Sequence, residues 1–217
     1  MMKSAIVLVS GGLDSAVCLK KAVDEGVAQL ALTFDYGQKA AKKEVEAAEK
    51  LCQLWDVPHR VIKLDWLAAI TKTALVNADM DVPTVGYDAS VERRKKAAAL
   101  VWVPNRNGVF VNIAAAYAEA LGCDTIIAGF NREEALYFPD NSIQFIAATN
   151  AALRLSTRTG TTLFSYTAHL MKKEVGRLAE RIGVPLDLLW CCYLGGPEPC
   201  GRCQSCLNFE IAVGKLL

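Results

Sequence analysis

The sequence predicts a doubly wound α/β fold, in which helices cover both faces of a parallel sheet, followed by a metal-binding knuckle near the C-terminus. Short apolar runs alternate along the chain with segments of helical periodicity. A glycine-rich turn joins the first strand to the first helix, and five of the eight cysteines lie between Cys191 and Cys206. With 217 residues, 53% of them hydrophobic, the chain is long enough for one substantial core. We therefore expect a single domain over residues 1–217.

Strands and helices alternate in the first third of the chain. Residues 4–9 form a short apolar run typical of a buried strand, and residues 14–25 carry apolar side chains at helical spacing. A second strand over 28–34, a helix over about 40–55 and a third strand over 59–64 follow. This order implies right-handed βαβ crossovers, and hence a parallel sheet with helices on both faces.

The rest of the chain is less regular. Periodicity weakens between about residues 65 and 108, where we expect a partly helical excursion of the kind that carries substrate contacts. Beyond it we predict three helices and one buried strand. The helices span residues 109–121, 143–155 and 172–182, and the strand spans 125–129.

Charge and hydropathy exclude several classes of function. Lys and Arg number 24 against 23 Asp and Glu, so the chain lacks the global positive charge that non-specific nucleic-acid binding requires. The one basic cluster, residues 93–96, is typical of a solvated helix face. No apolar run approaches the length of a membrane span or of a secretory signal. We expect a cytoplasmic protein that binds neither nucleic acid nor membrane directly.

The strongest chemical signal is the hexapeptide SGGLDS, which lies where the first strand ends and the first helix begins. Two glycines let the backbone approach an anion, and the following helix presents unpaired N–H groups and the positive end of its dipole. Asp14 adds the oxygen ligand that Mg²⁺ prefers. A tight turn with a helix cap is the alternative interpretation. The residues predicted to bind a pyrophosphate with Mg²⁺ are Ser10, Gly11, Gly12, Leu13, Asp14 and Ser15.

Four cysteines near the C-terminus have the spacing C-x7-C-x2-C-x2-C, within a segment of about residues 190–207. Four thiolates complete the tetrahedral coordination of Zn²⁺ and leave no open position, so we predict a structural zinc site. An iron–sulfur cluster, disulfides and free thiols are the alternatives, and Cys191 could replace the first ligand. The predicted ligands are Cys192, Cys200, Cys203 and Cys206.

The hexapeptide resembles the SGGxDS loop of the PP-loop ATP pyrophosphatases, and is neither a Walker A loop nor G-x-G-x-x-G. That resemblance implies a Rossmann-like, adenine nucleotide alpha hydrolase-like fold. It also implies cleavage of ATP between its α and β phosphates, with transfer of AMP to a substrate oxygen. Tyr36 follows the second strand at the sheet edge where such proteins bind nucleotides, so it is a candidate ATP contact, or merely an exposed aromatic in a turn.

Further motifs make the chain similar to the QueC family of 7-cyano-7-deazaguanine synthases over nearly its whole length. They are the SGGLDS loop, DYGQ at 35–38, VPNRN at 103–107, Gly129 with Asn131, FPD at 138–140, Lys172 with Glu174, and residues 190–206. The resemblance implies an ATP-dependent carbon–nitrogen ligase that converts 7-carboxy-7-deazaguanine and ammonia to the nitrile preQ0, for queuosine or archaeosine. It also suggests a homodimer.

The same resemblance nominates residues for the reaction. Lys172 and Arg106 are the candidate cations for the charge that develops on the α-phosphate, although a lysine at a helix start can equally be solvated. Carboxylates suit the N–H donors of a deazaguanine, although acids in loops are often only hydrated. The candidate substrate contacts are Asn107, Asn131, Glu134 and Asp140.

The chain also departs from the family pattern. It has Asn141-Ser142 where members carry Cys-Arg after Pro-Asp, and Cys191 where they carry serine. A PP-loop enzyme that adenylates a different small acid, or a tRNA base, is therefore an alternative. A zinc-knuckle binding module with a vestigial phosphate loop is the non-enzymatic alternative, although Ser10, Asp14 and Ser15 are all present.

Overall fold

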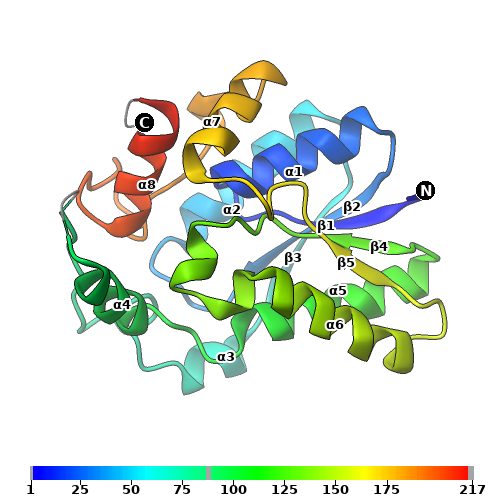
Figure 1. The fold of residues 1–217 in the computed structure, drawn as a ribbon, viewed down its shortest axis with the longest axis horizontal. Helices are drawn as coiled ribbons and strands as arrows, with labels where there is room; N and C mark the ends of the chain where they lie inside the picture. Colours follow the sequence, from blue (N-terminus) through cyan, green and yellow to red (C-terminus); the bar gives the residue numbers. More distant parts are fainter. Residues whose placement is uncertain (1, 87–88, 215–217) are drawn as a thin grey trace.

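The chain folds around a five-stranded parallel sheet of order β3-β2-β1-β4-β5, which confirms the predicted fold class (Figure 1). The computed structural model describes residues 2–86 and 89–214. The chain order reverses at β1, whose carboxyl end therefore lies at the switch point where doubly wound folds bind ligands. The strands are β1 Ala5–Leu8, β2 Ala28–Asp35, β3 His59–Lys63, β4 Thr125–Ile127 and β5 Thr162–Phe164.

Alternate side chains of the strands enter two separate cores, one on each face of the sheet. Val7 of β1 packs against α1, α2 and α7, whereas its neighbour Ile6 packs against α5 and α6. Both side chains are fully buried, as expected for a parallel sheet covered on both sides. These helices are α1 Leu13–Asp24, α2 Ala41–Leu54, α5 Arg106–Leu121, α6 Ile143–Ser156 and α7 Lys172–Arg181.

The excursion contains two helices, α3 Asp65–Ile70 and α4 Val91–Leu100. Ser90 caps α4 by accepting a hydrogen bond from the backbone N–H of Arg93. The excursion is shorter than predicted, because α5 begins at Arg106 and not near residue 109. Asn105, with φ of 48°, occupies the left-handed region and turns the chain into this helix. Arg106 and the residue after it therefore lie on the first turn of a helix and not in a loop.

Two short elements were missing from the prediction. The edge strand β5 has three residues, of which only Leu163 is buried, so it lacks the apolar run that identifies the other strands. The C-terminal segment ends in α8 Gln204–Val213, which contains Cys206 and packs closely on α7. A Cβ on Gly176 would lie 2.0 Å from the carbonyl oxygen of Ala212, so only glycine permits this approach of the two helices.

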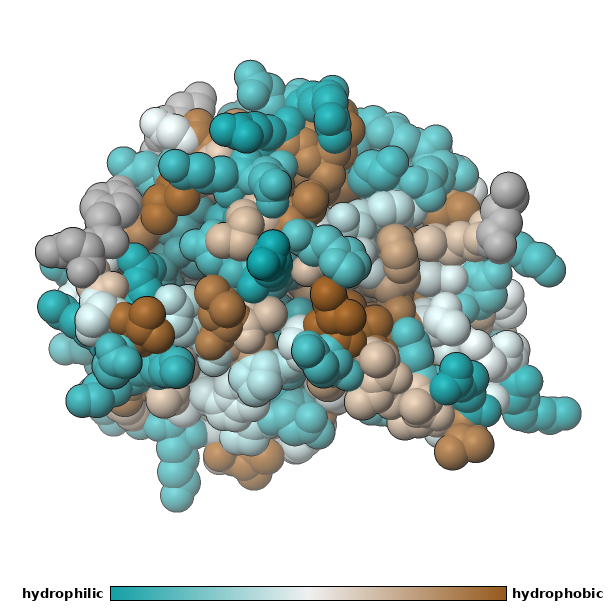
Figure 2. Space-filling view, in the orientation of Figure 1, coloured by the Kyte–Doolittle hydropathy of each residue, from teal (hydrophilic) through white to brown (hydrophobic). Residues whose placement is uncertain are grey.

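The surface is mixed in character. On the face shown in Figure 2, hydrophobic side chains occur in small groups separated by hydrophilic ones. Within residues 2–86 and 89–214, none of the helices combines the length and apolar character that a membrane span needs.

Candidate functional site

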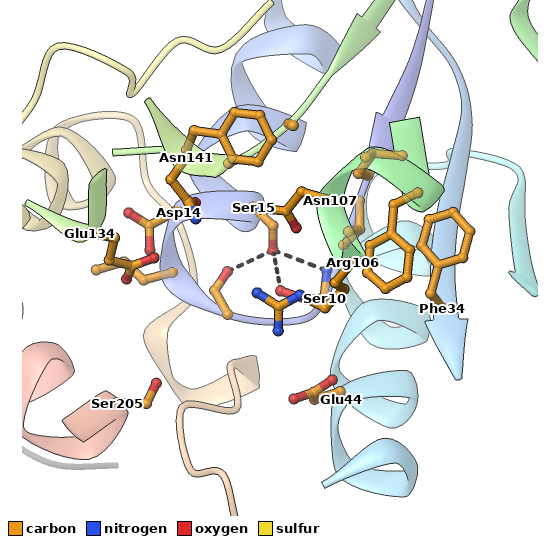
Figure 3. A pocket seen from close by; sticks show the side chains of 18 of the residues that line it. Ser10, Asp14, Ser15, Phe34, Glu44, Arg106, Asn107, Glu134, Asn141 and Ser205 are labelled. Carbon is orange, nitrogen blue, oxygen red and sulfur yellow. Dashed lines mark hydrogen bonds between the residues drawn. The ribbon is translucent and has the colours of Figure 1, made fainter. Parts of the chain in front are cut away.

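The SGGLDS hexapeptide forms the turn between β1 and α1 (Figure 3). Gly11 has a φ of +74°, and a Cβ there would lie 2.6 Å from Cβ of Ala47 and 2.8 Å from the carbonyl oxygen of Glu44. A side chain at position 11 would therefore push the loop away from α2. Inside the turn, the Ser15 hydroxyl accepts from the backbone N–H of Ser10 at 3.2 Å and donates to a backbone carbonyl at 2.9 Å. These bonds fix the loop at the start of α1.

The end of β4 contacts the same turn directly. A Cβ on Gly129 would lie 2.6 Å from the backbone nitrogen of Ser15, so the strand passes α1 at a distance that only glycine allows. This contact brings Asn131 beside Asp14. The amide of Asn131, which is fully buried, donates to the Asp14 carboxylate at 3.0 Å and accepts from the backbone N–H of Glu134 at 2.9 Å. Asn131 therefore positions both acids and caps the loop that carries Glu134.

A buried ammonium joins these two acids. Nζ of Lys172 lies 2.5 Å from Oδ2 of Asp14 and 2.7 Å from Oε1 of Glu134, and Lys172 is only 6% exposed. The alternative of a solvated lysine at the start of a helix is therefore wrong. Three segments far apart in sequence, at residues 14, 134 and 172, meet at one point beside the phosphate loop.

Burial and mutual charge shift the pKa values of this trio. For Lys172, burial lowers the pKa, but the charges of Asp14 and Glu134 outweigh burial and the net shift is upward. For Asp14, burial raises the pKa and outweighs the opposing effect of Lys172. For Glu134, burial also raises the pKa, but the Lys172 ammonium outweighs burial and the net shift is downward. Lys172 therefore stays protonated, and Asp14 is the acid that gains a proton more readily as the pH falls.

A cavity of about 230 Å³ extends from the phosphate loop. Glu134 and Asp14 lie on one side of it, and Glu44 and Phe34 lie on the other (Figure 3). Of the thirteen residues predicted to act in catalysis or to bind ATP or substrate, ten line it and three do not. Those that line it are Ser10, Gly12, Leu13, Asp14, Ser15, Tyr36, Arg106, Asn107, Glu134 and Lys172. Gly11, Asn131 and Asp140 lie behind the wall and act on residues that face the cavity.

Arg106 and Tyr36 meet in the wall of the same cavity. Nη1 of Arg106 donates to the Tyr36 hydroxyl at 3.3 Å, and the guanidinium lies 6.0 Å from the ring centroid. Burial raises the pKa of the buried Tyr36 phenol, so it stays neutral. Burial also raises the pKa of Glu44, a half-buried acid that accepts from the Gln38 amide at 2.8 Å. Glu44 was not predicted, because it lies in the first turn of α2 and nothing in its local sequence distinguishes it from a solvated acid.

The FPD segment at 138–140 lines the cavity through Phe138 and not through Asp140, which was predicted as a substrate contact. The side-chain amide of Asn107 donates to the backbone oxygen of Asp140 at 3.1 Å, and Asp140 itself does not line the cavity. Its neighbour Asn141 does (Figure 3). In the 3₁₀ turn Pro139–Asn141, successive side chains point in different directions. The position of a residue in the motif therefore did not show which side chain faces the cavity.

The four predicted metal ligands come together. Sγ atoms of Cys192, Cys200, Cys203 and Cys206 all lie within 4.8 Å of one another. Two of these separations are 3.9 Å and 3.5 Å, close to the edge of about 3.8 Å expected for a tetrahedron with metal–sulfur bonds near 2.3 Å. The set contains Cys192 and not Cys191. Backbone N–H groups of Leu194 and Cys200 each point to Sγ of Cys192 at 3.3 Å, as suits a thiolate.

The cysteine segment also forms part of the cavity. The backbone N–H of Trp190 donates to the carbonyl oxygen of Gly11 at 3.0 Å, which ties the segment to the phosphate loop. Cys191, Tyr193, Ser205 and Phe209 line the cavity from this side. None of the four was predicted to line the nucleotide cavity, and Cys191 was considered only as an alternative metal ligand, because the segment's sequence indicated a local metal site packed on the domain. The metal site and the phosphate loop are neighbours in the fold.

Comparisons with known proteins identify relatives over the whole of this architecture. The family model for the queuosine biosynthesis protein QueC matches residues 4–215. A 7-cyano-7-deazaguanine synthase from Pelotomaculum thermopropionicum is 52% identical over 207 residues, which cover 94% of each chain. One from Carboxydothermus hydrogenoformans is 50% identical over 214 residues, covering 98% of this chain and 99% of the relative. One from the methanogen Methanosarcina mazei is 45% identical and covers 94% and 90%.

Solved structures with similar folds are more distant in sequence. The NMN synthetase from Francisella tularensis superposes with a TM-score of 0.52 at 17% identity, covering 100% of this chain and 79% of that one. A predicted subunit of tRNA methyltransferase from Methanocaldococcus jannaschii gives a TM-score of 0.51 at 17% identity, covering 82% and 75%. At this identity the likeness concerns the fold alone.

Proposed function

The chain belongs to the QueC family of queuosine biosynthesis proteins, and on that premise we propose that it is a 7-cyano-7-deazaguanine synthase, an ATP-dependent carbon–nitrogen ligase. Its substrates would be 7-carboxy-7-deazaguanine, ammonia and ATP. One observation carries the proposal. The phosphate loop, the Lys172 trio and the second cation Arg106 all line one cavity, so a nucleotide bound at the loop would have two positive charges in the wall around it.

The reaction explains why such a site is needed. A carboxylate is a poor electrophile because its leaving group would be oxide, whereas an acyl adenylate loses AMP instead. Ammonia attacks the activated carbon to give an amide, and a second adenylation of the amide oxygen permits its loss to leave the nitrile. Both oxygens of the acid thus depart on AMP, so each nitrile formed requires two ATP molecules.

The roles of the charged residues follow from their positions. Ser10, Gly12 and Ser15 would bind the released pyrophosphate at the start of α1, where backbone N–H groups and the helix dipole favour an anion. Lys172 and Arg106 would stabilise the charge that develops at the α-phosphate as the P–O bond breaks. Because Lys172 is fixed by its two acids, it needs little reorganisation when that charge appears.

Asp14 and Glu134 are the acids that would bind Mg²⁺ with the nucleotide. Both carboxylates lie beside the phosphate loop and both line the cavity, so their oxygens suit a hard cation. When bound there, Mg²⁺ would neutralise phosphate charge. Asn131 would keep Asp14 in place throughout, since it donates to that carboxylate from a fully buried position.

We propose zinc as the metal of the four-cysteine site. Four thiolates with the observed separations suit tetrahedral Zn²⁺, and the site leaves no open position for a substrate. The metal would therefore act structurally, by fixing the segment that contacts Gly11 through Trp190.

We further propose a single PP-loop domain that works in the cytoplasm as a homodimer on free small molecules. The family match over residues 4–215 supports one domain. Eight free cysteines suit a reducing compartment. A net charge of +1 offers little attraction for nucleic acid.

One observation favours a second candidate substrate. Asn141 lines the cavity at a position where the family pattern has cysteine, and Ser142 replaces the arginine that follows it. A change in the cavity wall is the kind of difference that alters which acid is adenylated. The second candidate is therefore the same chemistry on a related small acid.

The experiment that tests the proposal uses 7-carboxy-7-deazaguanine labelled with ¹⁸O in its carboxylate, together with ATP, Mg²⁺ and ammonium. We expect two AMP molecules, each with one ¹⁸O, for every nitrile detected by mass spectrometry. Formation of ADP would contradict adenylation. If AMP forms only when a different acid is supplied, the adenylation chemistry is correct but the substrate is that other acid.

A further inference from the structure

A second, smaller cavity of about 30 Å³ lies beside the main one. It forms where α4, the 3₁₀ turn Glu134–Leu136 and α8 meet, and it is far too small for a nucleotide or a deazapurine. A cavity of this size accommodates one or two molecules as small as water. The residues that line both cavities are Val101, Glu134, Phe138 and Tyr193. These four residues therefore belong to a wall that the two cavities share.

The wall of the small cavity is suited to a small nitrogen donor. Glu133 and Glu134 supply carboxylate acceptors, and Tyr137, Phe138 and Tyr193 supply aromatic rings, which attract a cation to their faces. Glu133 also accepts a hydrogen bond from the backbone N–H of Lys172 at 3.2 Å, which orients its carboxylate.

One cation and two amides complete the polar part of the wall. The Arg94 guanidinium donates to the backbone oxygen of Ala89 and to Oε1 of Gln204, each at 3.3 Å. The Gln204 amide in turn donates to Asn208 at 2.6 Å. The wall thus contains two carboxylates and one guanidinium. Lys172 pairs with one of the carboxylates, that of Glu134, so Glu133 is the acid without an ammonium partner among the salt bridges of the described residues.

We propose that this small cavity is the entry and binding site for ammonia, an inference that rests on the proposed function. ATP and the acid would fill the main cavity, so the nucleophile needs a separate route to the acyl carbon. Glu134 and Tyr193 belong to both walls, which places the small cavity beside the reaction site. Ammonium would bind to Glu133, beside Glu134, and pass one proton through the Glu133 carboxylate to solvent. The free lone pair then forms the C–N bond, the C–O bond to AMP breaks with its electrons on AMP, and the surplus proton leaves by the same carboxylate.

The test fills the cavity without touching the proposed catalytic residues. Ala98 lines the small cavity from α4 and is 8% exposed, whereas its neighbour Ala99 is exposed on the same helix. In Ala98→Leu we expect the KM for ammonium to rise about tenfold or more. The KM values for ATP and the acid stay unchanged, as does the acid-dependent exchange of pyrophosphate into ATP, which needs no ammonia. Ala99→Leu is the matched control and leaves every parameter at the wild-type value.

A second variant covers the case in which Ala98→Leu does not fold. Glu133→Gln keeps an acceptor for the backbone of Lys172 but removes the charge, and we expect a rise of about tenfold in the KM for ammonium alone. A wild-type KM for ammonium in both folded variants overturns the ammonia site and leaves adenylation intact. Absence of acid-dependent pyrophosphate exchange in the unmodified enzyme overturns the proposed function, and the ammonia site with it.

Discussion

Replacing Lys172 by methionine tests the charge arrangement at the centre of the site. Methionine is close to lysine in length but lacks the ammonium, so Asp14 and Glu134 lose the partner that lies 2.5 and 2.7 Å away. Their side chains are only 13% and 29% exposed, so water cannot fully replace that partner. Lys173 is the next residue along α7 and is exposed, so Lys173→Met is the matched control.

The expected cost is that of breaking a buried ion pair, about 3–5 kcal/mol in the free energy of unfolding near neutral pH. Without the ammonium, burial raises the pKa of both acids above their values in the unfolded chain. A group whose pKa is raised by folding stabilises the protein below its unfolded pKa and loses that effect as the pH rises. The deficit of Lys172→Met should therefore be largest at neutral pH and should shrink as the pH falls toward 5.

Urea unfolding at pH 7.5 and pH 5.5 measures this directly. With a typical urea dependence, the midpoint at pH 7.5 should fall by about 1–3 M in Lys172→Met and stay near wild type in Lys173→Met. Acid-dependent pyrophosphate exchange should fall by about 100-fold or more in the folded fraction. If the free energy of unfolding of Lys172→Met is lower than that of the wild type by less than about 1 kcal/mol at both pH values, Lys172 does not offset the buried charges of Asp14 and Glu134, and the reasoning is refuted.

Four further predictions concern single features of the fold. Asp14→Asn should reduce pyrophosphate exchange by about 100-fold or more without loss of the metal, whereas Asp24→Asn at the far end of α1 should not. Cys192→Ser should reduce metal content and also weaken ATP binding in titration calorimetry, since the segment contacts Gly11; retention of full ATP affinity would contradict this coupling. Gly129→Ala should cost about 1–3 kcal/mol in urea unfolding and raise the KM for ATP, while Gly196→Ala, whose Cβ would meet no atom nearer than 3.5 Å, should do neither. Burial lowers the pKa of His59, so the neutral imidazole contributes to the free energy of unfolding above the unfolded pKa, and this contribution is lost as the pH falls. The free energy of unfolding should therefore decline from pH 7.5 to 5.5, and it should decline less steeply in His59→Gln.

The features that sequence reasoning predicted well are local in the chain. The phosphate loop depends on six consecutive residues between a strand and a helix, and the four cysteines lie within fifteen residues of one another. Apolar runs identified the inner strands β1, β2 and β4 for the same reason, since these strands are largely buried and read as continuous apolar runs. The short edge strand β5 is buried only at Leu163 and left no such signal.

Sequence reasoning could not predict which residues that are far apart in the chain meet in the fold. Lys172 and Glu134 were candidates as separate residues, but their meeting with Asp14 depends on the register of β4 and on the close passage of Gly129 over α1. Asp140 was nominated because the family carries an acid at that position, whereas the structure has the next residue of the 3₁₀ turn, Asn141, in the cavity wall. Glu44 has no motif at all, and its place in the cavity wall follows from the packing of α2 against the phosphate loop.

The position of the cysteine site explains why a structural metal belongs in this enzyme. Residues 190–193 run beside the phosphate loop, with Trp190 bonded to Gly11, Cys191 and Tyr193 on the cavity wall and Cys192 in the thiol cluster. Another cluster member, Cys203, precedes α8, whose Ser205 and Phe209 also line the cavity. Ordering residues 190–207 by apolar burial alone would require a larger hydrophobic core than so short a segment provides. Four metal–thiolate bonds would fix it with few residues, so the proposed zinc would order one wall of the cavity without taking part in the reaction.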